Sequence, residues 1–252
     1  MEAGKTIALT GKGGTGKSIV ASLMIHMLAR RHPGQVLAID ADSAMSLQYT
    51  LGIPVEKTVS AFRKEIVGLQ QIKREMNDKP LGEVMRGLIN HGEGIDLLAM
   101  GRPEEPGCYC TVNDLLRYGM DQLTQGYMIT IVDGEAGPEQ INRRVLGSID
   151  TLLVVADMSV RSLETARGIL SIAKKSADGI HVKQTGLILN RVRGDASVTE
   201  LSERVGVPVI GCIPEDAVLN QYDRDGKPLR LLPPDTPSVA AVQDILRQLQ
   251  IE

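Results

Sequence analysis

Residues 11–18, GKGGTGKS, constrain the fold of this chain more than any other segment. The apolar run TIALTG (6–11) precedes them, and the amphipathic run KSIVASLMIHMLARR (17–31) follows. They match the pattern G-x-x-x-x-G-K-[ST], whose glycines let the backbone curl until its N–H groups converge on phosphate oxygens. The start of the following helix adds a partial positive charge. A strand, a glycine-rich loop and a helix in this order predict a phosphate-binding loop rather than a turn without function.

Six further short apolar runs predict buried strands, and most lack strict alternation, as expected when both faces of a sheet are covered. They are VLAID (36–40), IDLLAMG (95–101), YMITIVD (127–133), TLLVVAD (151–157), TGLILN (185–190) and VPVIGCIP (207–214). Amphipathic segments such as VRSLETARGILSIAKKSA (160–177) and SVTELSERVG (197–206) lie between them. We therefore expect an α/β fold of the P-loop NTPase type, with a mostly parallel sheet of about seven or eight strands and helices on both faces.

The domain organisation follows from the same pattern. No linker, repeat or low-complexity tract interrupts the chain, so residues 1–252 are expected to form a single P-loop ATPase domain. The segment from about 52 to 94 is longer than one crossover needs. Its runs EKTVSAFRKEIVGLQQIKREM (56–76) and PLGEVMRGLINHG (80–92) predict a helical insertion.

Composition argues against two classes of partner. Aromatic residues make up 2% of the chain, and the net charge is -3, so a surface that stacks nucleobases or binds nucleic acid is not expected. No run approaches the roughly 18 apolar residues of a membrane span, and no signal peptide is evident. The C-terminal run PSVAAVQDILRQLQIE has one Arg and no Lys, which disfavours a basic membrane anchor. We expect a cytoplasmic protein, because three cysteines are too few for a disulfide framework.

The loop predicts ATP and Mg²⁺ as cofactors. Lys17 would reach the β- and γ-phosphates, and Ser18 would ligate Mg²⁺. The expected phosphate contacts are made by Gly11, Lys12, Gly13, Gly14, Thr15, Gly16, Lys17 and Ser18.

The early lysine makes the loop distinctive. GKGGTGKS resembles the deviant P-loop of the MinD/ParA/nitrogenase-iron-protein superfamily of ATPases, and the resemblance covers nearly the whole chain with its motifs in order. In that superfamily the early lysine, here Lys12, crosses a dimer interface to the partner's nucleotide and meets the developing γ-phosphate charge. The resemblance implies a homodimer and a catalytic role for Lys12 beside Lys17. The alternative is a solvated surface lysine.

The same resemblance assigns roles to acidic residues at two predicted strand ends. In IDADS (39–43), Asp42 falls where family members place the aspartate that orients the attacking water, and Asp40 is interpreted as structural. IVDGEAG (131–137) resembles a Walker B element, whose Asp133 would hold a water on Mg²⁺. The implied switch residues are Asp42, Glu135 and Gly137. Helix N-capping is the alternative for an acid at a strand end.

Two later segments resemble the adenine pocket of the superfamily. LILNRV (187–192) contains the asparagine that would read adenine, Asn190, and GCIPED (211–216) resembles the loop that closes the pocket. An amide both donates and accepts hydrogen bonds, as the edge of adenine requires. The implied pocket residues are Asn190, Arg191, Pro214 and Glu215. Turn chemistry alone is the alternative.

Two cysteines, Cys108 and Cys110, stand one residue apart in EEPGCYCTVN (104–113). With the run GEAGPEQ (134–140), they resemble the CooC-type accessory ATPases that insert nickel into carbon monoxide dehydrogenase and acetyl-CoA synthase. One departure is SAMS (43–46), where that family often has a proline and asparagines.

Two thiolates are half of a four-coordinate site, and a two-fold dimer would supply the other half. Four thiolates suit Zn²⁺ as a tetrahedron or Ni²⁺ as a square plane. The resemblance therefore implies an ATPase whose dimer depends on nucleotide and metal, and whose client is a nickel enzyme of the carbon monoxide dehydrogenase/acetyl-CoA synthase type. Two inert buried thiols are the alternative, and the lone Cys212 is interpreted as a small hydrophobic residue.

Three other functions stay open. The four sulfurs of two C-x-C pairs also suit a subunit-bridging [4Fe–4S] cluster in an ATP-dependent reductase. A MinD/ParA-like positioning ATPase and a metal-free regulatory switch are the others.

Overall fold

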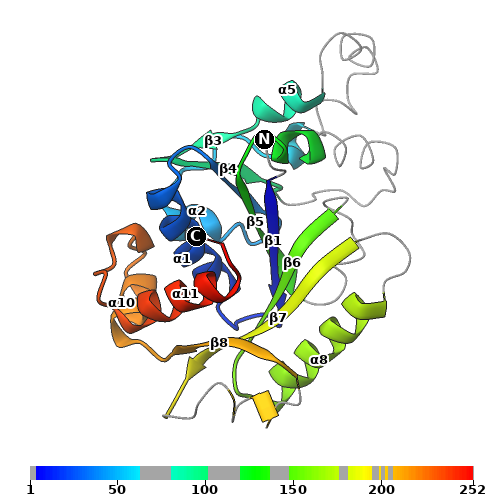
Figure 1. Cartoon of the computed structure of the whole chain (residues 1–252). Coiled ribbons are helices and arrows are strands. Elements are labelled where there is room, and N and C mark those ends of the chain that lie inside the picture. The colour runs from blue at the N-terminus through cyan, green and yellow to red at the C-terminus, as the bar shows by residue number, and fades with distance from the viewer. Residues whose placement is uncertain are drawn as a thin grey trace.

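The computed structural model of this chain describes residues 4–62, 81–101, 120–136, 148–175, 181–194, 199, 202–203 and 207–251. A single eight-stranded sheet forms the centre of the molecule (Figure 1), with the strand order β3-β4-β2-β5-β1-β6-β7-β8. The strands are β1 (Lys5–Gly11), β2 (Val36–Asp40), β3 (Asn90–His91), β4 (Ile95–Ala99), β5 (Ile129–Ala136), β6 (Ser148–Ala156), β7 (His181–Val192) and β8 (Val209–Pro214). Among the strands in the described ranges, only β3 runs antiparallel to its neighbour, so the predicted fold class is confirmed.

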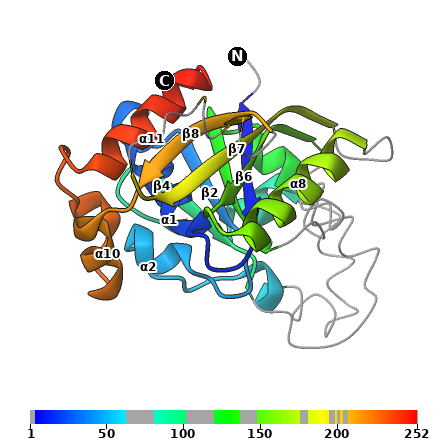
Figure 2. The same ribbon diagram turned by 90° about the horizontal axis from the view of Figure 1, so that it is seen from below.

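Helices cover both faces of the sheet. They are α1 (Lys17–Arg31), α2 (Leu47–Leu51), α5 (Leu81–Arg86), α8 (Val160–Lys175), α10 (Ala217–Arg224), the 3₁₀ turn η2 (Leu229–Leu231) and α11 (Pro237–Gln248). Helix α8 lies on one face, and α1 and α11 lie on the other (Figures 1 and 2). Strand β2 buries every residue, as a parallel strand covered on both sides should.

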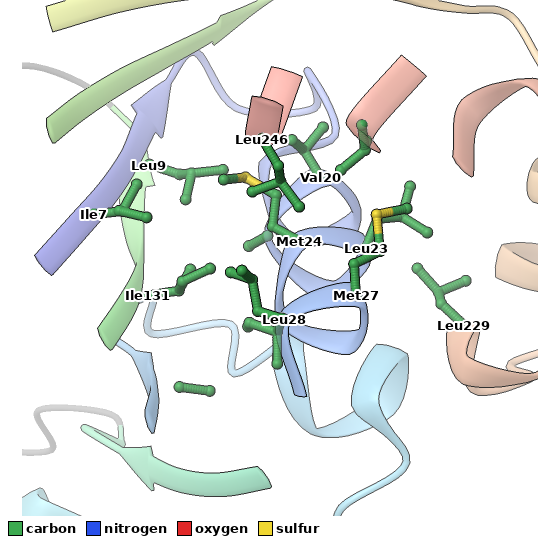
Figure 3. Packing of buried hydrophobic residues seen from close by; sticks show 14 of the residues in the cluster. Ile7, Leu9, Val20, Leu23, Met24, Met27, Leu28, Ile131, Leu229 and Leu246 are labelled. Atoms are coloured by element: carbon green, nitrogen blue, oxygen red, sulfur yellow. The ribbon is translucent and has the colours of Figure 1, made fainter. Parts of the chain in front are cut away.

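Helix α1 is enclosed on all sides by apolar contacts. Its residues from Val20 to Ala29 are buried. Figure 3 shows those it labels, from Val20 to Leu28, between the central strands and the C-terminal elements. Met24 and Leu28 face the strands, and Leu229 lies on the side of Met27. Each buried side chain of this size contributes about 1.5–3 kcal/mol through the hydrophobic effect. The helix is therefore a rigid support for the loop before it.

One carboxylate joins the end of β8 to two helices. The Asp216 side chain accepts hydrogen bonds from Val218 N and Leu219 N at the start of α10. Its other oxygen accepts from the backbone N–H and hydroxyl of Ser238 in α11. Burial opposes its ionisation, but these hydrogen bonds lower the pKa of Asp216 overall. Because α11 contacts α1, the end of β8 is tied to the helix that follows the glycine-rich loop.

The described residues of the segment where a helical insertion is expected include both a helix and a short strand. Residues 81–86 form α5, but 90–91 form the edge strand β3. The Asn90 side chain explains the difference, because its oxygen accepts from Glu56 N and Lys57 N while β3 pairs with β4. The predicted helix at 56–76 extends beyond the described residues, which stop at 62. Among the helices described, none has both the length and the apolar composition to cross a membrane.

Candidate functional site

The glycine-rich loop lies between β1 and α1, where the carboxyl ends of the parallel strands meet. Two of its glycines cannot carry a side chain. Gly11 has φ 146°, and a Cβ there would lie 2.2 Å from the Val155 carbonyl oxygen. Gly16 has φ 87°, and its Cβ would lie 2.4 Å from Asn190 Nδ2. The loop therefore needs glycine both for its left-handed turns and for its close approach to β6 and β7.

The carbonyl oxygen of Lys12 closes the loop. It accepts from Thr15 Oγ1 at 2.9 Å and from Thr15 N at 3.4 Å. It also accepts from Lys17 Nζ at 3.5 Å, and Lys17 is only 6% exposed. A long contact of this kind holds the ammonium over the loop and leaves it most of its capacity to donate to a phosphate.

The start of α1 suits an anion. Its N-cap is Gly16, which provides no side-chain cap, and the first turn contains no acidic residue. The first N–H groups of the helix therefore present a partial positive charge without a carboxylate to neutralise it. A phosphate group fits this position on charge and on hydrogen bonding.

Asp133 is fully buried, and neither of its carboxylate oxygens has a hydrogen-bond partner among the residues described. It lies beside Asp40 across the β2–β5 pair. Burial raises the pKa of Asp133 to about 7; the nearby Ser18 hydroxyl and Lys17 charge oppose the shift, and the Asp40 charge adds to it. A buried acid without a partner, next to a hydroxyl, fits a divalent cation held directly or through water.

Asp40 and Asp42 have different surroundings. Asp40 is 1% exposed and accepts from Leu47 N at 2.9 Å and Asp42 N at 3.2 Å. Burial raises the pKa of Asp40 to about 6 despite these two hydrogen bonds. Asp42 is half-buried, and its carboxylate accepts from Ala44 N at 2.9 Å. Asp40 thus shapes the turn, as expected, while Asp42 lies at the surface of the site with acceptor capacity remaining.

Asp157, at the end of β6, is a site residue that the sequence analysis did not name. Its carboxylate accepts from Ser159 N at 2.9 Å. Burial opposes ionisation, yet hydrogen bonds from Ser159 and the charges of Lys12 and Arg191 lower its pKa overall. Since β6 pairs with β1, the half-buried Lys12 and Asp157 follow neighbouring strands. No local motif marks this acid; only the strand order places it beside the loop.

The residues expected to form the adenine pocket lie at the ends of β7 and β8. Asn190 is 4% exposed, and its Nδ2 donates to the Thr15 carbonyl at 2.8 Å. Arg191 Nη1 donates to the Gly14 carbonyl at 3.2 Å. Glu215 is exposed and forms a two-point ion pair with Arg193. Pro214 ends β8 beside Val192, so these residues do gather at one edge of the sheet.

Other predicted site residues lie outside the described part of the chain: Cys108, Cys110 and Gly137. Glu135 is half-buried on β5, and its carbonyl accepts from Thr10 Oγ1 at 3.4 Å. In the ranges that the structure describes, no three His, Cys, Asp or Glu side chains gather as a metal site.

Comparisons with known proteins agree with this fold. The family model of the CobQ/CobB/MinD/ParA nucleotide binding domain matches residues 6–229. An uncharacterized ATP-binding protein of Methanocaldococcus jannaschii is 33% identical over 253 residues, which cover 96% of this chain and 97% of that protein. The carbon monoxide dehydrogenase accessory protein CooC of Rhodospirillum rubrum is 28% identical over 87% of each chain. The MinC:MinD cell division protein complex of Aquifex aeolicus has the same fold, with a TM-score of 0.73, 21% identity and coverage of 98% of this chain and 96% of that one.

Burial of Asp133 should make the free energy of unfolding depend on pH. Its pKa rises from 3.8 to about 7 on folding, so the folded chain binds the proton more tightly than the unfolded chain. Stability should therefore fall as the pH rises from about 4 to about 7. Without Mg²⁺ or nucleotide, Asp133→Asn should raise the free energy of unfolding by about 2–4 kcal/mol at pH 8 and by much less at pH 5.

Urea unfolding of both proteins at the two pH values measures this difference. Asp42→Asn is the matched control, because Asp42 is half-buried rather than fully buried. An equal effect of Asp133→Asn at pH 5 and pH 8 would contradict the assignment of an unpaired, desolvated carboxylate.

Proposed function

Because the chain belongs to the CobQ/CobB/MinD/ParA nucleotide binding domain family, we propose that it hydrolyses ATP to control a homodimer that carries a metal ion. The cargo is Ni²⁺ or Zn²⁺, held by Cys108 and Cys110 from both subunits. The client is a nickel enzyme of the carbon monoxide dehydrogenase/acetyl-CoA synthase type. The pairing of a C-x-C sequence with similarity to a CooC accessory protein carries the proposal.

The nucleotide part of the proposal rests on two facing groups of opposite charge. Lys17 and the start of α1 are positive and lie on the loop side. Asp133 is a buried carboxylate without a partner in the described structure, and Ser18 lies near it. Lys17 would hold the β- and γ-phosphates, Ser18 would contact Mg²⁺, and Asp133 would hold a water on that ion. Bound Mg²⁺ supplies positive charge that neutralises the phosphate oxygens as bond cleavage proceeds.

Hydrolysis also needs an oriented water and a stabiliser of the developing charge. Asp42 has the exposure and the acceptor capacity to orient a water beside the γ-phosphate. Lys12 is half-buried, and its charge reaches Asp157 at the end of β6. In the proposed dimer this ammonium would serve the nucleotide of the second subunit. The adenine would lie at the ends of β7 and β8, and Glu135 and Gly137 would move with the switch.

The metal part of the proposal rests on coordination number. One chain offers two adjacent thiols, and an open two-ligand site binds metal weakly. A two-fold axis through the pair completes four thiolates, which suits Zn²⁺ or Ni²⁺. Nucleotide and metal then favour the same dimer, so each must increase the affinity for the other. Hydrolysis would weaken the dimer and release the metal to its client.

The first prediction from this proposal tests the phosphate site. Lys17→Ala should weaken ATP binding by about 100-fold, because a charge-assisted contact to phosphate is lost. Isothermal titration calorimetry measures the affinity, and thermal unfolding verifies that the variant folds. An affinity within threefold of the wild type would refute the assignment of the phosphate site.

The second prediction tests the role of Lys12. Lys12→Gln should leave ATP binding by the monomer nearly unchanged, while ATP hydrolysis falls by about 10³-fold and nucleotide-linked dimerisation is lost. Phosphate release and sedimentation velocity measure these two properties. Unchanged hydrolysis would exclude action across the dimer interface.

The third prediction tests the metal site. Replacement of Cys108 or Cys110 by Ser should remove tight binding of one Ni²⁺ or Zn²⁺ per two chains while ATP binding survives. Binding should weaken as the pH falls, because thiolate is the form that binds metal. Elemental analysis and metal titration measure the stoichiometry. Cys212→Ser is the matched control, since burial raises the pKa of that thiol and it should not contribute.

The same experiment separates the rival functions. One metal per monomer, or tight binding by the double Cys108/Cys110 variant, contradicts the proposed site. A brown iron–sulfur chromophore at full occupancy in protein purified without air would assign the four sulfurs to a [4Fe–4S] cluster instead. A dimer that forms without metal and binds a membrane or DNA would favour a MinD/ParA-like positioning ATPase.

A further inference from the structure

Arg191 has an unusual backbone for its residue type. Its φ is 57°, in the left-handed region that residues with a Cβ rarely adopt. Asn190 supports this conformation, because Asn190 Oδ1 accepts from Arg191 N at 3.0 Å. The pairing of β7 with β8 shifts register between Leu189 and Val192, as at a β-bulge. Bulges beside functional sites commonly redirect a side chain, and backbone strain of this kind persists only where its surroundings hold it.

The redirected side chain reaches the glycine-rich loop. Arg191 Nη1 donates to the Gly14 carbonyl at 3.2 Å, and Asn190 Nδ2 donates to the next carbonyl, that of Thr15, at 2.8 Å. Two consecutive residues of β7 therefore hold two consecutive carbonyl groups of the loop from the same side. Gly14 itself is exposed, with φ 82°, and no heavy atom lies within 4 Å of the point that a Cβ would occupy. Side-chain packing around Gly14 therefore does not restrain its peptide.

Peptide geometry converts this contact into control of the loop's N–H groups. In a trans peptide the C=O of one residue and the N–H of the next point in opposite directions. A guanidinium that holds the Gly14 carbonyl therefore turns the Thr15 N–H towards the interior of the loop. The structure agrees, since Thr15 N faces the Lys12 carbonyl at 3.4 Å. This long contact leaves the N–H able to exchange that partner for a phosphate oxygen.

We propose that Arg191 is a positioning residue of the phosphate-binding loop: its guanidinium fixes the Gly14–Thr15 peptide so that the N–H faces the phosphates. This replaces the place in the adenine pocket that the superfamily resemblance implies for Arg191, and it rests on the proposed nucleotide site. Arg191 acts through the loop backbone and makes no contact with the base.

The charges around Arg191 agree with this role. The pKa of Glu215 is lowered, chiefly by its hydrogen bonds with Arg193 and further by the charge of Arg191. The pKa of Asp157 is lowered despite burial, by Ser159 first and then by Lys12 and Arg191. Carboxylates at the ends of β6 and β8 therefore lie on either side of Arg191. These carboxylates weaken the electrostatic attraction between Arg191 and a free triphosphate. They leave Arg191 suited to donate a hydrogen bond to a backbone carbonyl.

The experiment compares Arg191→Gly with Arg193→Gly. Glycine accepts the left-handed backbone at 191, so the first variant removes the guanidinium without new strain. Arg193→Gly removes the same charge two residues away, where the side chain contacts Glu215 rather than the loop. The ligands are Mg²⁺ with inorganic tripolyphosphate, ATP or GTP, and binding is measured by calorimetry.

Arg191→Gly should weaken tripolyphosphate, ATP and GTP by the same factor, about tenfold, as expected for one lost hydrogen bond from a charged donor. The preference for ATP over GTP should not change. Arg193→Gly should leave tripolyphosphate affinity within about twofold of the wild type, because its charge is already paired with Glu215. Arg191→Lys keeps a charged donor and should recover part of the loss.

Two outcomes overturn the proposal. If Arg191→Gly weakens ATP but not tripolyphosphate, Arg191 reads the base. If Arg193→Gly weakens tripolyphosphate binding as strongly, the loss comes from removing any positive charge near the phosphates and not from the contact with the loop. Thermal unfolding reports on the fold, and Arg191→Asn, which also tolerates a left-handed backbone, is the substitute if the glycine variant unfolds. Failure of the phosphate site itself is recognised separately, because Lys17→Ala would then bind tripolyphosphate as the wild type does.

Discussion

A buried carboxylate that lacks a hydrogen-bond partner in the described structure lies at the centre of this molecule, and the rest of the site is arranged around it. Desolvation of such a group costs stability, and folded chains rarely keep one without a use for it. Strand order places Asp133 there, because β5 lies between β2 and β1. The same order places Asp40 beside it and the positive start of α1 in front of it. A complex of Mg²⁺ with a polyphosphate presents a cation to the acids and anions to the helix, so it neutralises both groups at once.

The glycine-rich loop must keep its position when a charged ligand binds. Helix α1 supports the loop, since its residues from Val20 to Ala29 are buried against the central strands and the C-terminal elements. The ties at the other side of the loop are polar. Asn190 and Arg191 hold two loop carbonyls, and Asp216 ties the end of β8 to α11, which contacts α1. The apolar contacts fix where the loop lies, and the polar contacts fix how its peptides are turned.

The parts of the fold that local pattern controls could be predicted from the sequence. The bounds expected for α1 and β2 are those observed, because a long, mostly apolar run and a short apolar run that ends in an acid carry strong signals. Helix α1 is buried all round from Val20 to Ala29 and is therefore not the amphipathic helix expected from the sequence. A two-residue strand such as β3 has no period to detect, and the run from 80 to 92 therefore resembled a helix throughout. In the site, the loop motif indicated Lys17 and Ser18, and a strand end indicated Asp133. The contacts of Arg191 and Asp157 depend on a left-handed residue and on strand order, and neither leaves a local pattern.

The neighbouring charges of Lys12 and Asp157 bear on how a dimer would form. If Lys12 acts on the nucleotide of a second subunit, its ammonium group must move away from the negative charge of Asp157. The charge of Lys12 is one of the causes that lower the pKa of Asp157, after the hydrogen bonds from Ser159. A γ-phosphate carries more negative charge than one carboxylate, so in the proposed mechanism it would attract Lys12 more strongly than Asp157 does. After release of the phosphate, Asp157 would again be the nearer anion. The acid at the end of β6 would then make the position of Lys12 depend on the γ-phosphate, as the proposed dimer requires.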